Sequence, residues 1–538
     1  MKKDYRLFNY FNKNLKNIKK YPEAEFQILI EFHGWKVLHV IYALLANFFL
    51  KNTNYKILAY SSNNFLSQKN FFKKIIEDFK WYLGSFLKCK TFKLYSAFGT
   101  SDFIKVKSTS RFYLQSKHFL KKIYKTKINK SDILNLQYDN ILIGDILYDS
   151  YLRLYNKPTL DPNNIEFIIF FQKFMESIFF WINYFEKNNV QIVIAAHATF
   201  FEGIPLRIAI FKNKKAFIAN AEKIYFLNKK NIYPHTEYLF FKKNFSKLSK
   251  QQKNRAITIA KNKINQRFRG ILGDMIYLTK TAYGEIKNNR VILKSKNKKI
   301  IIAAHSFCDA PHARGNGLFN DYYEWINFLF KLSKETNYDW YIKCHPNFHE
   351  YFDNTVSIIK ADLKKYPNIK WIEPGASHKQ IIKEGINLAL TCDGSIGLEY
   401  AYFGIPVINA SRNNYHINYN FNFHPVNIKD YKKLILNLNF LKKDIKRKEV
   451  LECYFMNYIF NDNTWFFEDI KKTINYVGGY KNLFNSDKIY NFFINFMGEK
   501  RIIRINQYLD TFLSKKDYLL NFNHMGRSIN NVLEDNKN

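Results

Sequence analysis

The segment TCDGSIGLEYAYFGIPVINA (391–410) places polar and glycine residues between two apolar runs, in an order suited to binding an anion. An apolar strand ends at Cys392, Asp393–Gly394 forms the turn, and Ser395 occupies the position of a helix N-cap. The amides of the first helical turn and the helix dipole favour a phosphate group. Glu399 follows on the same helix face, where its carboxylate can accept hydrogen bonds from ribose hydroxyls. The alternative is an ordinary N-cap with a solvated glutamate.

Two other strand ends in the same half of the chain carry groups that can meet a phosphate. In KCHPNFH, His345 follows an apolar strand, and Pro346 forces it into an extended conformation that points the imidazole away from the sheet. His305 ends the run KIIIAAH, and Arg314 lies in the loop of small residues that follows. Each residue alone is more often structural. Together they predict a nucleotide phosphate site formed by His305, Arg314, His345, Pro346, Asp393, Gly394, Ser395 and Glu399.

The first half of the chain offers candidates for a catalytic base. Asp149 lies in GDILYDSYLR, and His197 and Glu202 lie in AAHATFFEG, both segments expected to follow strands. A sugar hydroxyl that attacks an activated donor needs a carboxylate or an imidazole to take its proton. Two structural alternatives stay open: Asp149 can pair with Arg153 four residues on, and His197 can be a loop-packing residue.

The elements that must position these residues alternate between strand and helix. Strands are expected at 26–32, 55–61, 140–144, 190–196 and 214–220, and again at 299–305, 339–346, 369–374, 386–392 and 405–410. This alternation predicts an α/β chain with two Rossmann-like domains that face a cleft. The expected domains are an N-terminal domain for the acceptor (1–235), a helical connector (236–298), a nucleotide-sugar domain (299–430) and a basic helical C-terminal extension (431–538).

Composition limits the partners and the compartment. The chain has 84 Lys and Arg against 45 Asp and Glu, a net charge of +39, but the basic residues are scattered and no nucleic-acid motif appears. We therefore expect an anionic membrane surface or an acidic glycan as partner and no nucleic acid, although an AT-rich genome also explains part of the charge. Five widely spaced cysteines and the absence of a signal peptide predict a cytoplasmic protein, peripheral on the inner face of the membrane.

A metal site is not expected, because the spacing His305, Cys308, His312 has no second ligand pair nearby. The apolar stretches 37–50 and 167–185 are too short or too interrupted to span a bilayer, and both are expected to be core helices.

The strand-end histidine, the HP motif and the segment D-G-S…E…G-I-P-V resemble the donor domain of GT-B glycosyltransferases, and AHSFCDAPH and AHATFFEGIPLRIAI resemble surface-carbohydrate biosynthesis proteins. The closest fit is the bacterial capsule and surface-polysaccharide group, which includes Kdo-transferase-like and sialyltransferase-like enzymes that use CMP-sugars. The resemblance implies that His345 and Ser395 bind the CMP phosphate, that Glu399 lies near the ribose, and that neither a metal nor a cofactor is needed. One departure is Gly394–Ser395 where such enzymes commonly have two serines. The acidic catalytic motif of sialyltransferases is also missing, so the resemblance assigns no base.

The leading hypothesis from the sequence is a metal-independent glycosyltransferase that moves a sugar from a nucleotide donor, with CMP-sugar favoured, to a surface polysaccharide or a lipid-linked glycan. One alternative is transfer of glycerol phosphate from CDP-glycerol. A sugar-nucleotide epimerase is disfavoured by the basic charge. A non-catalytic scaffold with a decayed transferase fold, binding membrane or glycan, is the alternative from another class.

Overall fold

A computed structural model describes residues 4–14, 23–61, 65–68, 70–273, 278–348, 354–461 and 464–537. The chain divides into two compact units. Unit 1 comprises residues 1–150, 161–234 and 463–527, and unit 2 comprises residues 151–160, 235–462 and 528–538. The expected connector 236–298 therefore belongs to unit 2, and most of the expected C-terminal extension belongs to unit 1.

Unit 1 is built on a six-stranded sheet of order β3-β2-β1-β6-β7-β8. All neighbouring strands are parallel except β8, which runs antiparallel to β7. The strands follow the apolar runs of the sequence, as expected for strands buried on both faces. Their bounds are β1 Phe26–Glu31, β2 Lys56–Ser61, β3 Thr100–Lys105, β6 Asn189–Ala195, β7 Lys215–Ala219 and β8 Ile224–Leu227.

The structure of residues 140–153 differs from the prediction, which placed a strand at 140–144. Only β4 (Gln137–Tyr138) and β5 (Ile141–Leu142) form, as a short antiparallel pair outside the main sheet, and helix α7 (Gly144–Tyr155) begins at once. A Cβ at Gly144 would lie 2.1 Å from the carbonyl oxygen of Ile133, so only glycine fits where the helix starts. Asp145 and Asp149 therefore lie on a helix and not at the end of a sheet strand.

The helices of unit 1 come from both ends of the chain. Helix α2 (Lys36–Asn52) is apolar on all sides and is buried without interruption from Val37 to Leu50, because helices from the C-terminal segment also pack against it. The other helices of unit 1 are α1 Asp4–Asn14, α3 Phe71–Phe86, α4 Thr91–Ala97, α5 Ser110–Ile123, α6 Lys130–Leu134, α8 Ile165–Lys187, α9 Ile204–Phe211, α18 Ile470–Val477, α19 Tyr480–Asn485, α20 Lys488–Phe496 and α21 Glu499–Lys515.

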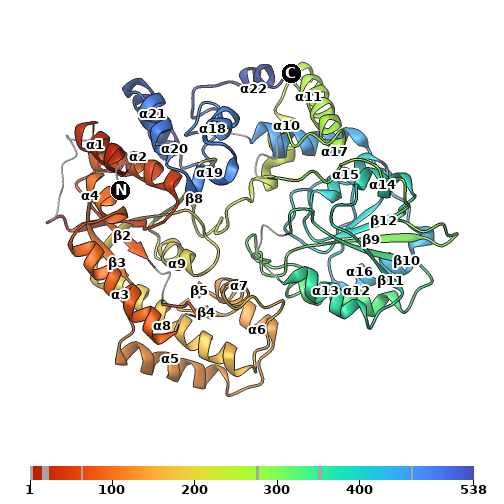
Figure 1. The fold of residues 1–538 in the computed structure, drawn as a ribbon, viewed down its shortest axis with the longest axis horizontal. Coiled ribbons are helices and arrows are strands. Elements are labelled where there is room, and N and C mark those ends of the chain that lie inside the picture. The colour runs from red at the N-terminus through yellow and green to blue at the C-terminus, as the bar shows by residue number, and fades with distance from the viewer. Residues whose placement is uncertain are drawn as a thin grey trace. The chain divides into compact units, whose positions relative to one another are not determined.

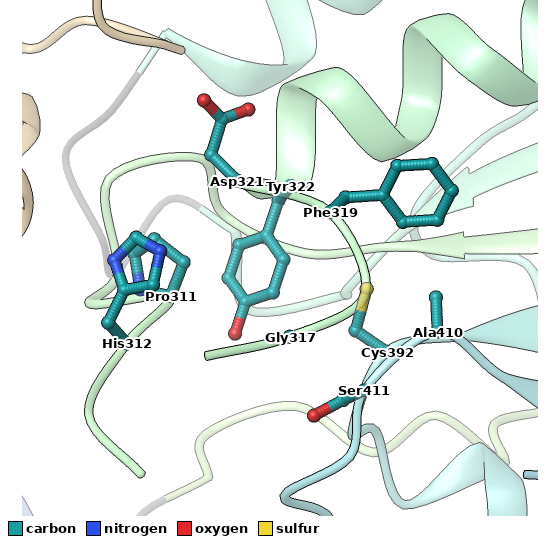
Figure 2. Close-up of a pocket in the computed structure, with 9 residues that line it drawn as sticks. All are labelled: Pro311, His312, Gly317, Phe319, Asp321, Tyr322, Cys392, Ala410 and Ser411. Atoms are coloured by element: carbon teal, nitrogen blue, oxygen red, sulfur yellow. The ribbon is translucent and has the colours of Figure 1, made fainter. Parts of the chain in front are cut away.

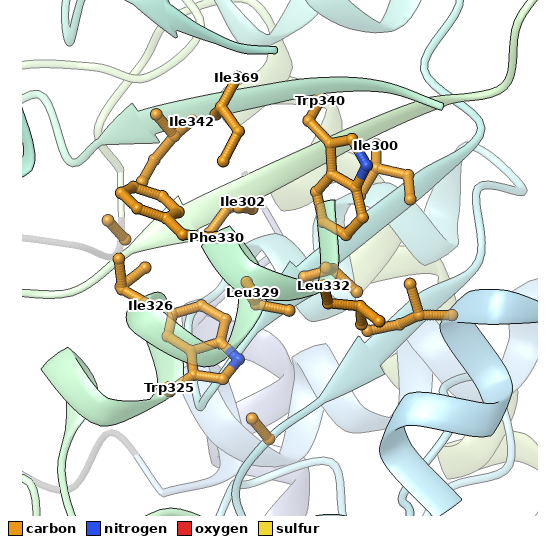
Figure 3. Close-up of a cluster of buried hydrophobic side chains, with 14 of the residues drawn as sticks. Ile300, Ile302, Trp325, Ile326, Leu329, Phe330, Leu332, Trp340, Ile342 and Ile369 are labelled. Carbon is orange, nitrogen blue, oxygen red and sulfur yellow. The ribbon is translucent and has the colours of Figure 1, made fainter. Parts of the chain in front are cut away.

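Unit 2 is built on a five-stranded parallel sheet of order β11-β10-β9-β12-β13. Side chains on alternate positions of β9 enter opposite layers of the core: Ile300 and Ile302 pack with Trp325 and Trp340 (Figure 3), and Ile301 packs with Tyr400. The strands are β9 Lys299–Ala304, β10 Asp339–Cys344, β11 Ile369–Ile372, β12 Leu388–Thr391 and β13 Val407–Asn409.

Helices cover both faces of this sheet, with α12 and α13 on one side and α14 and α15 on the other (Figure 1). The expectation of an α/β chain with two Rossmann-like domains is confirmed. The helices of unit 2 are α10 Phe241–Ser246, α11 Lys250–Phe268, α12 Tyr322–Ser333, α13 Thr355–Leu363, α14 His378–Lys383, α15 Ile396–Tyr402, α16 Ile428–Leu436, α17 Arg447–Phe455 and α22 Ile529–Asp535. No helix in the described ranges is long and apolar enough to cross a membrane.

Each sheet has a point where its strand order reverses beside the first strand of its unit. In unit 1 this point lies between β1 and β6, and in unit 2 it lies between β9 and β12. The connections leave in opposite directions there and open a crevice at the carboxyl ends of the strands, which is where open α/β sheets bind ligands. The residues that follow these four strands are therefore the first place to look for function.

Candidate functional site

His305 occupies the reversal point of unit 2, directly after β9. Its Nε2 accepts a hydrogen bond from the amide of Cys392 (3.3 Å) and lies 3.1 Å from Oγ1 of Thr391. The ring proton is therefore on Nδ1, which faces Oδ1 of Asp393 at 3.6 Å. Burial lowers the pKa of His305 while Asp393 opposes that shift, so the ring is neutral near pH 7.

Arg314 reaches the same point from the loop that follows β9. Its guanidinium donates to Oδ2 of Asp393 at 3.3 Å, so one carboxylate holds both the neutral ring of His305 and the charged guanidinium of Arg314. The ring of Tyr322 stacks on His305 with 4.8 Å between centroids, and Figure 2 shows its hydroxyl pointing into a small pocket. The pocket is lined by Pro311, His312, Gly317, Phe319, Asp321, Tyr322, Cys392, Ala410 and Ser411.

His345 follows β10, the neighbour of β9 on the other side. Its Nδ1 accepts a hydrogen bond from the amide of Asn347 (3.1 Å), which leaves the proton on Nε2 as a donor. Asn347 is itself held by the hydroxyl of Thr279 (2.9 Å), so the ring orientation is fixed from behind. Burial, reinforced by Lys343, lowers the pKa of His345 to about 4, so at neutral pH this donor carries no charge.

The turn 393–395 differs in detail from the expected N-cap. Ser395 has helical dihedral angles (φ −58°, ψ −21°), and its hydroxyl makes no capping hydrogen bond. Gly394 fills the position against β12 instead: its amide donates to Oγ1 of Thr391 (3.1 Å), and a Cβ there would lie 2.9 Å from that oxygen. The hydroxyl of Ser395 lies 3.5 Å from Arg267.

Glu399 lies one turn into α15 and is only 3% exposed. Its Oε1 accepts from Nε of Arg267 at 2.6 Å, and its Oε2 accepts from the hydroxyl of Tyr283 at 2.8 Å. Both carboxylate oxygens are therefore engaged by the segment expected as a connector, which this ion pair ties to α15. The expected contact of Glu399 with a ribose stays a prediction.

The reversal point of unit 1 holds a residue that sequence reasoning missed. Glu31 ends β1, is 4% exposed, and its Oε2 accepts a hydrogen bond from the amide of Ala196 at 2.7 Å. Its Oε1 lies 4.0 Å from Nε2 of His33. Burial raises the pKa of Glu31 to about 7, although the amide of Ala196 opposes the shift. A carboxyl group with this pKa can take and return a proton at neutral pH.

His197 and Glu202 belong to the same edge of the unit 1 sheet. His197 is exposed and contacts the ring of Trp35 edge-on, with 5.5 Å between centroids. Burial lowers the pKa of His33 to about 3, and the neighbouring His197 adds to this shift. Glu202 lies in a short 3-10 helix (Phe201–Gly203) and, together with Glu31, raises the pKa of the buried Tyr60, again mainly a burial effect.

Asp149 lies elsewhere in unit 1. Burial raises the pKa of Tyr233, and the carboxylates of Asp145 and Asp149 add to this shift. The hydroxyl of Tyr233 donates to Asp145 at 2.9 Å. Asp145 in turn forms a buried ion pair with Arg207 at 2.8 Å, an arrangement typical of a structural network. The structure therefore brings His197 and Glu202 toward Glu31 and places Asp149 in a different cluster.

A histidine and an asparagine that follow β13 complete the edge of unit 2. Nδ2 of Asn422 donates to the carbonyl of Gly397 (2.9 Å) and lies 3.3 Å from Nδ1 of His416, so the imidazole proton is on Nε2. A Cβ at Gly397 would lie 2.6 Å from His416, which shows how closely this ring covers the start of α15. Sequence reasoning missed both residues, and the only available signal was the density of His and Asn in 413–424.

No group of three or more metal-ligating side chains suited to an ion exists among the residues that the structure covers. No family model and no curated protein matches the sequence.

Several solved structures match at low similarity. A β-Kdo 2,4-transferase, KpsC, of Thermosulfurimonas dismutans is 8% identical over 49% of this chain and 79% of its own, with a TM-score of 0.33. A UDP-GlcNAc 2-epimerase of Methanocaldococcus jannaschii is 12% identical over 80% of this chain and 98% of its own, with a TM-score of 0.23. A glycosyltransferase of Rickettsia africae is 12% identical over 88% and 99%, with a TM-score of 0.22. Sequence identities and TM-scores this low assign neither a substrate nor a residue role to this chain.

Proposed function

We propose that the protein is a glycosyltransferase that uses a nucleotide-activated sugar, with unit 2 binding the donor and unit 1 binding the acceptor. The observation that carries this proposal is the contrast between the two reversal points. The edge of unit 2 presents hydrogen-bond donors (Arg314 and the Nε2 of His345), and the edge of unit 1 presents a carboxyl group, Glu31, with a pKa of about 7. Donors suit a phosphate, and a titrating carboxyl group suits a hydroxyl that must lose its proton.

The roles in the donor site follow from the hydrogen-bond inventory. Arg314 and His345 donate to phosphate oxygens, and Asp393, which can only accept while ionised, takes a hydroxyl of the ribose or of the sugar. Gly394, Ser395 and Pro346 shape the backbone around the phosphate, and His305 holds Asp393 in place. Glu399 has a positioning role, because its ion pair with Arg267 holds α15 in place.

The chemistry is a displacement at the anomeric carbon. Glu31 takes the proton of the acceptor hydroxyl, the hydroxyl oxygen bonds to the anomeric carbon, and the bond from that carbon to the phosphate oxygen breaks. The negative charge that develops on the leaving phosphate is stabilised by Arg314 and by the N–H of His345. His197 and Glu202, which approach Glu31, are the residues proposed to contact the acceptor, and Asp149 is the weakest of the earlier base candidates. No metal takes part in this scheme.

Within this proposal CMP is the favoured nucleotide, because of the HP motif and the serine that follows Gly394. The acceptor is a growing surface polysaccharide or a lipid-linked glycan on the cytoplasmic side of the membrane. Transfer of glycerol phosphate from CDP-glycerol is the second candidate, since the same donor groups would serve a nucleotide diphosphate.

A thermal-shift panel tests the donor site. The wild type is heated with CMP, CDP, UDP, GDP or ADP, and a ligand present at a hundred times its Kd stabilises the native state by about 2.7 kcal/mol. We expect a shift with CMP that is lost in the variant His345→Ala/Ser395→Ala and kept in the control His118→Ala, an exposed histidine of unit 1. A larger shift with another nucleotide would mean that the donor sugar is carried by that nucleotide and not by CMP. No shift with any of the five would favour the non-catalytic scaffold.

Turnover separates the two enzyme candidates. The protein is incubated with a surface-polysaccharide acceptor and either a CMP-sugar or CDP-glycerol, and the released CMP is measured by chromatography. Release from the CMP-sugar that depends on Glu31 supports glycosyl transfer. Release from CDP-glycerol alone would support the glycerophosphotransferase.

A further inference from the structure

Helix α3 (Phe71–Phe86) of unit 1 carries apolar side chains on its outer face. At i, i+3 and i+4 spacings they form one continuous row, and their exposed fractions run from 44% to 84%. We call this row the α3 stripe: Phe72, Ile75, Ile76, Phe79, Leu83 and Phe86. A row of this kind normally faces the core of a protein, so an outward orientation indicates a partner.

The opposite face of α3 is the one that packs on unit 1. Trp81 contacts Phe32 and Phe92 with 5.0 Å between ring centroids in each case. A Cβ at Gly84 would lie 2.6 Å from the ring of Phe92, so the helix lies directly against the unit at this point. The stripe is therefore exposed because the other face of the helix is anchored, and Figure 1 shows α3 along the outer side of unit 1.

The charges around the α3 stripe are positive. Lys73 and Lys80 are exposed on the helix itself, and Lys88 and Lys90 follow directly after it. The acidic residues of α3 lie on the packed side, where Asp78 pairs with Lys105. The ammonium group of Lys107 lies 5.0 Å from the centroid of the Tyr82 ring, which adds one more cation at the edge of the stripe.

We propose that α3 docks this protein on an anionic lipid bilayer, with the α3 stripe inserted at the boundary between headgroups and acyl chains and the flanking lysines on the headgroups. An apolar row bordered by lysines is the pattern of a helix that lies in the membrane plane, and α3 is about 24 Å long. Anionic headgroups complement the lysines. A second copy of the chain fits less well, because a two-fold pairing of the stripes would bring the same lysines together. This inference concerns attachment and does not depend on the proposed chemistry.

Vesicle sedimentation tests the docking. The full chain is mixed with vesicles of phosphatidylcholine alone or of phosphatidylcholine with phosphatidylglycerol. We expect binding to the anionic vesicles only, weakened by salt, and a loss of at least about tenfold in the variant Phe79→Asp/Phe86→Asp. The control is Phe440→Asp, since Phe440 of unit 2 is 82% exposed, close to the 84% of Phe86, but lies outside the stripe.

The chain also supplies its own reporter. Cys89 is exposed just beyond α3, whereas Cys308, Cys344, Cys392 and Cys453 are buried. An environment-sensitive fluorophore on Cys89 should brighten and shift to the blue with anionic vesicles, and Cys89→Ser should take no label. Without vesicles, the far-ultraviolet circular dichroism and the melting temperature of Phe79→Asp/Phe86→Asp should match those of the wild type, which shows that unit 1 is folded.

Three results would overturn the proposal. The wild type could fail to bind anionic vesicles, or Phe79→Asp/Phe86→Asp could bind as tightly as the wild type does. The wild type could also form a dimer in sedimentation velocity that this variant does not form, while neither binds vesicles. That last result would assign the stripe to a second copy of the chain.

Discussion

Replacing Glu31 with glutamine should stabilise unit 1, and by an amount that grows with pH. Burial raises the pKa of Glu31 to about 7, whereas the ordinary value is 4.5. The native state therefore holds a proton between pH 4.5 and 7 that the unfolded chain has lost, so this group costs stability as the pH rises through that window. At about 1.4 kcal/mol for each pKa unit, the cost above pH 7 is roughly 3 kcal/mol.

Glutamine is neutral at every pH and keeps a carbonyl oxygen for the amide of Ala196. The stability difference between Glu31→Gln and the wild type should therefore be small near pH 4.5 and rise to about 3 kcal/mol by pH 8. In a domain of this order of size, 1 kcal/mol moves the melting temperature by about 2–4 °C. The difference in melting temperature should thus widen by up to about 6–12 °C across the series.

The assay is thermal unfolding followed by circular dichroism in buffers from pH 4.5 to 8.5 for the two proteins side by side. Glu186→Gln serves as the control, because the side chain of Glu186 is 58% exposed in the same unit. A difference that stays flat across the pH range, or that narrows as the pH rises, would refute the assignment of Glu31 as a buried titrating group.

Four further predictions concern unit 2 and the proposed base. Arg267→Met should destabilise the protein by about 3–5 kcal/mol in urea unfolding, because it leaves the buried carboxylate of Glu399 unpaired, and adding Glu399→Leu should recover most of that loss. Gly397→Ala should cost about 1–3 kcal/mol in the same assay, since its methyl group would lie 2.6 Å from His416. The contribution of His345 to nucleotide affinity, measured by calorimetry on the wild type and on His345→Ala, should stay constant from pH 6 to 8, because a pKa of about 4 keeps the ring neutral throughout. In the proposed reaction, Glu31→Gln should lower kcat by about 10²–10⁴.

Most strands of both sheets could be predicted closely from the sequence, although β3 (Thr100–Lys105) and β8 (Ile224–Leu227) were not among those expected. Expected strands at 26–32 and 299–305 correspond to β1 (Phe26–Glu31) and β9 (Lys299–Ala304), because unbroken runs of Ile, Leu and Ala between polar residues are typical of parallel strands. The strand expected at 140–144 was wrong, since a run of three apolar residues is compatible with a strand, a hairpin or the start of a helix. Only the packing against Ile133 decides in favour of the helix start at Gly144.

The candidate site was predictable only in part, for reasons of distance and burial. His305 and Asp393 could be placed together because parallel strands end at one edge of their sheet, and they do face each other at 3.6 Å. The pairing of Glu399 with Arg267 could not be predicted, because Arg267 lies 132 positions earlier in a segment without a recognisable motif. Glu31 was overlooked because a terminal charged residue is ordinary for a strand, and its unusual pKa arises from burial that only the assembled unit provides.

The return of the C-terminal helices to unit 1 has a consequence for how the chain is made. The hydroxyl of Tyr10 donates to the carbonyl of Met497 (2.9 Å), His39 contacts the hydroxyl of Tyr490 (2.6 Å), and Lys36 pairs with Asp487. A ribosome delivers about 5–20 residues per second, so α2 waits for its C-terminal partners until nearly the whole chain has emerged. The sheet of unit 2 is complete by Asn409 and can form first. Helix α2 is thus among the first helices to be synthesised and among the last to be covered.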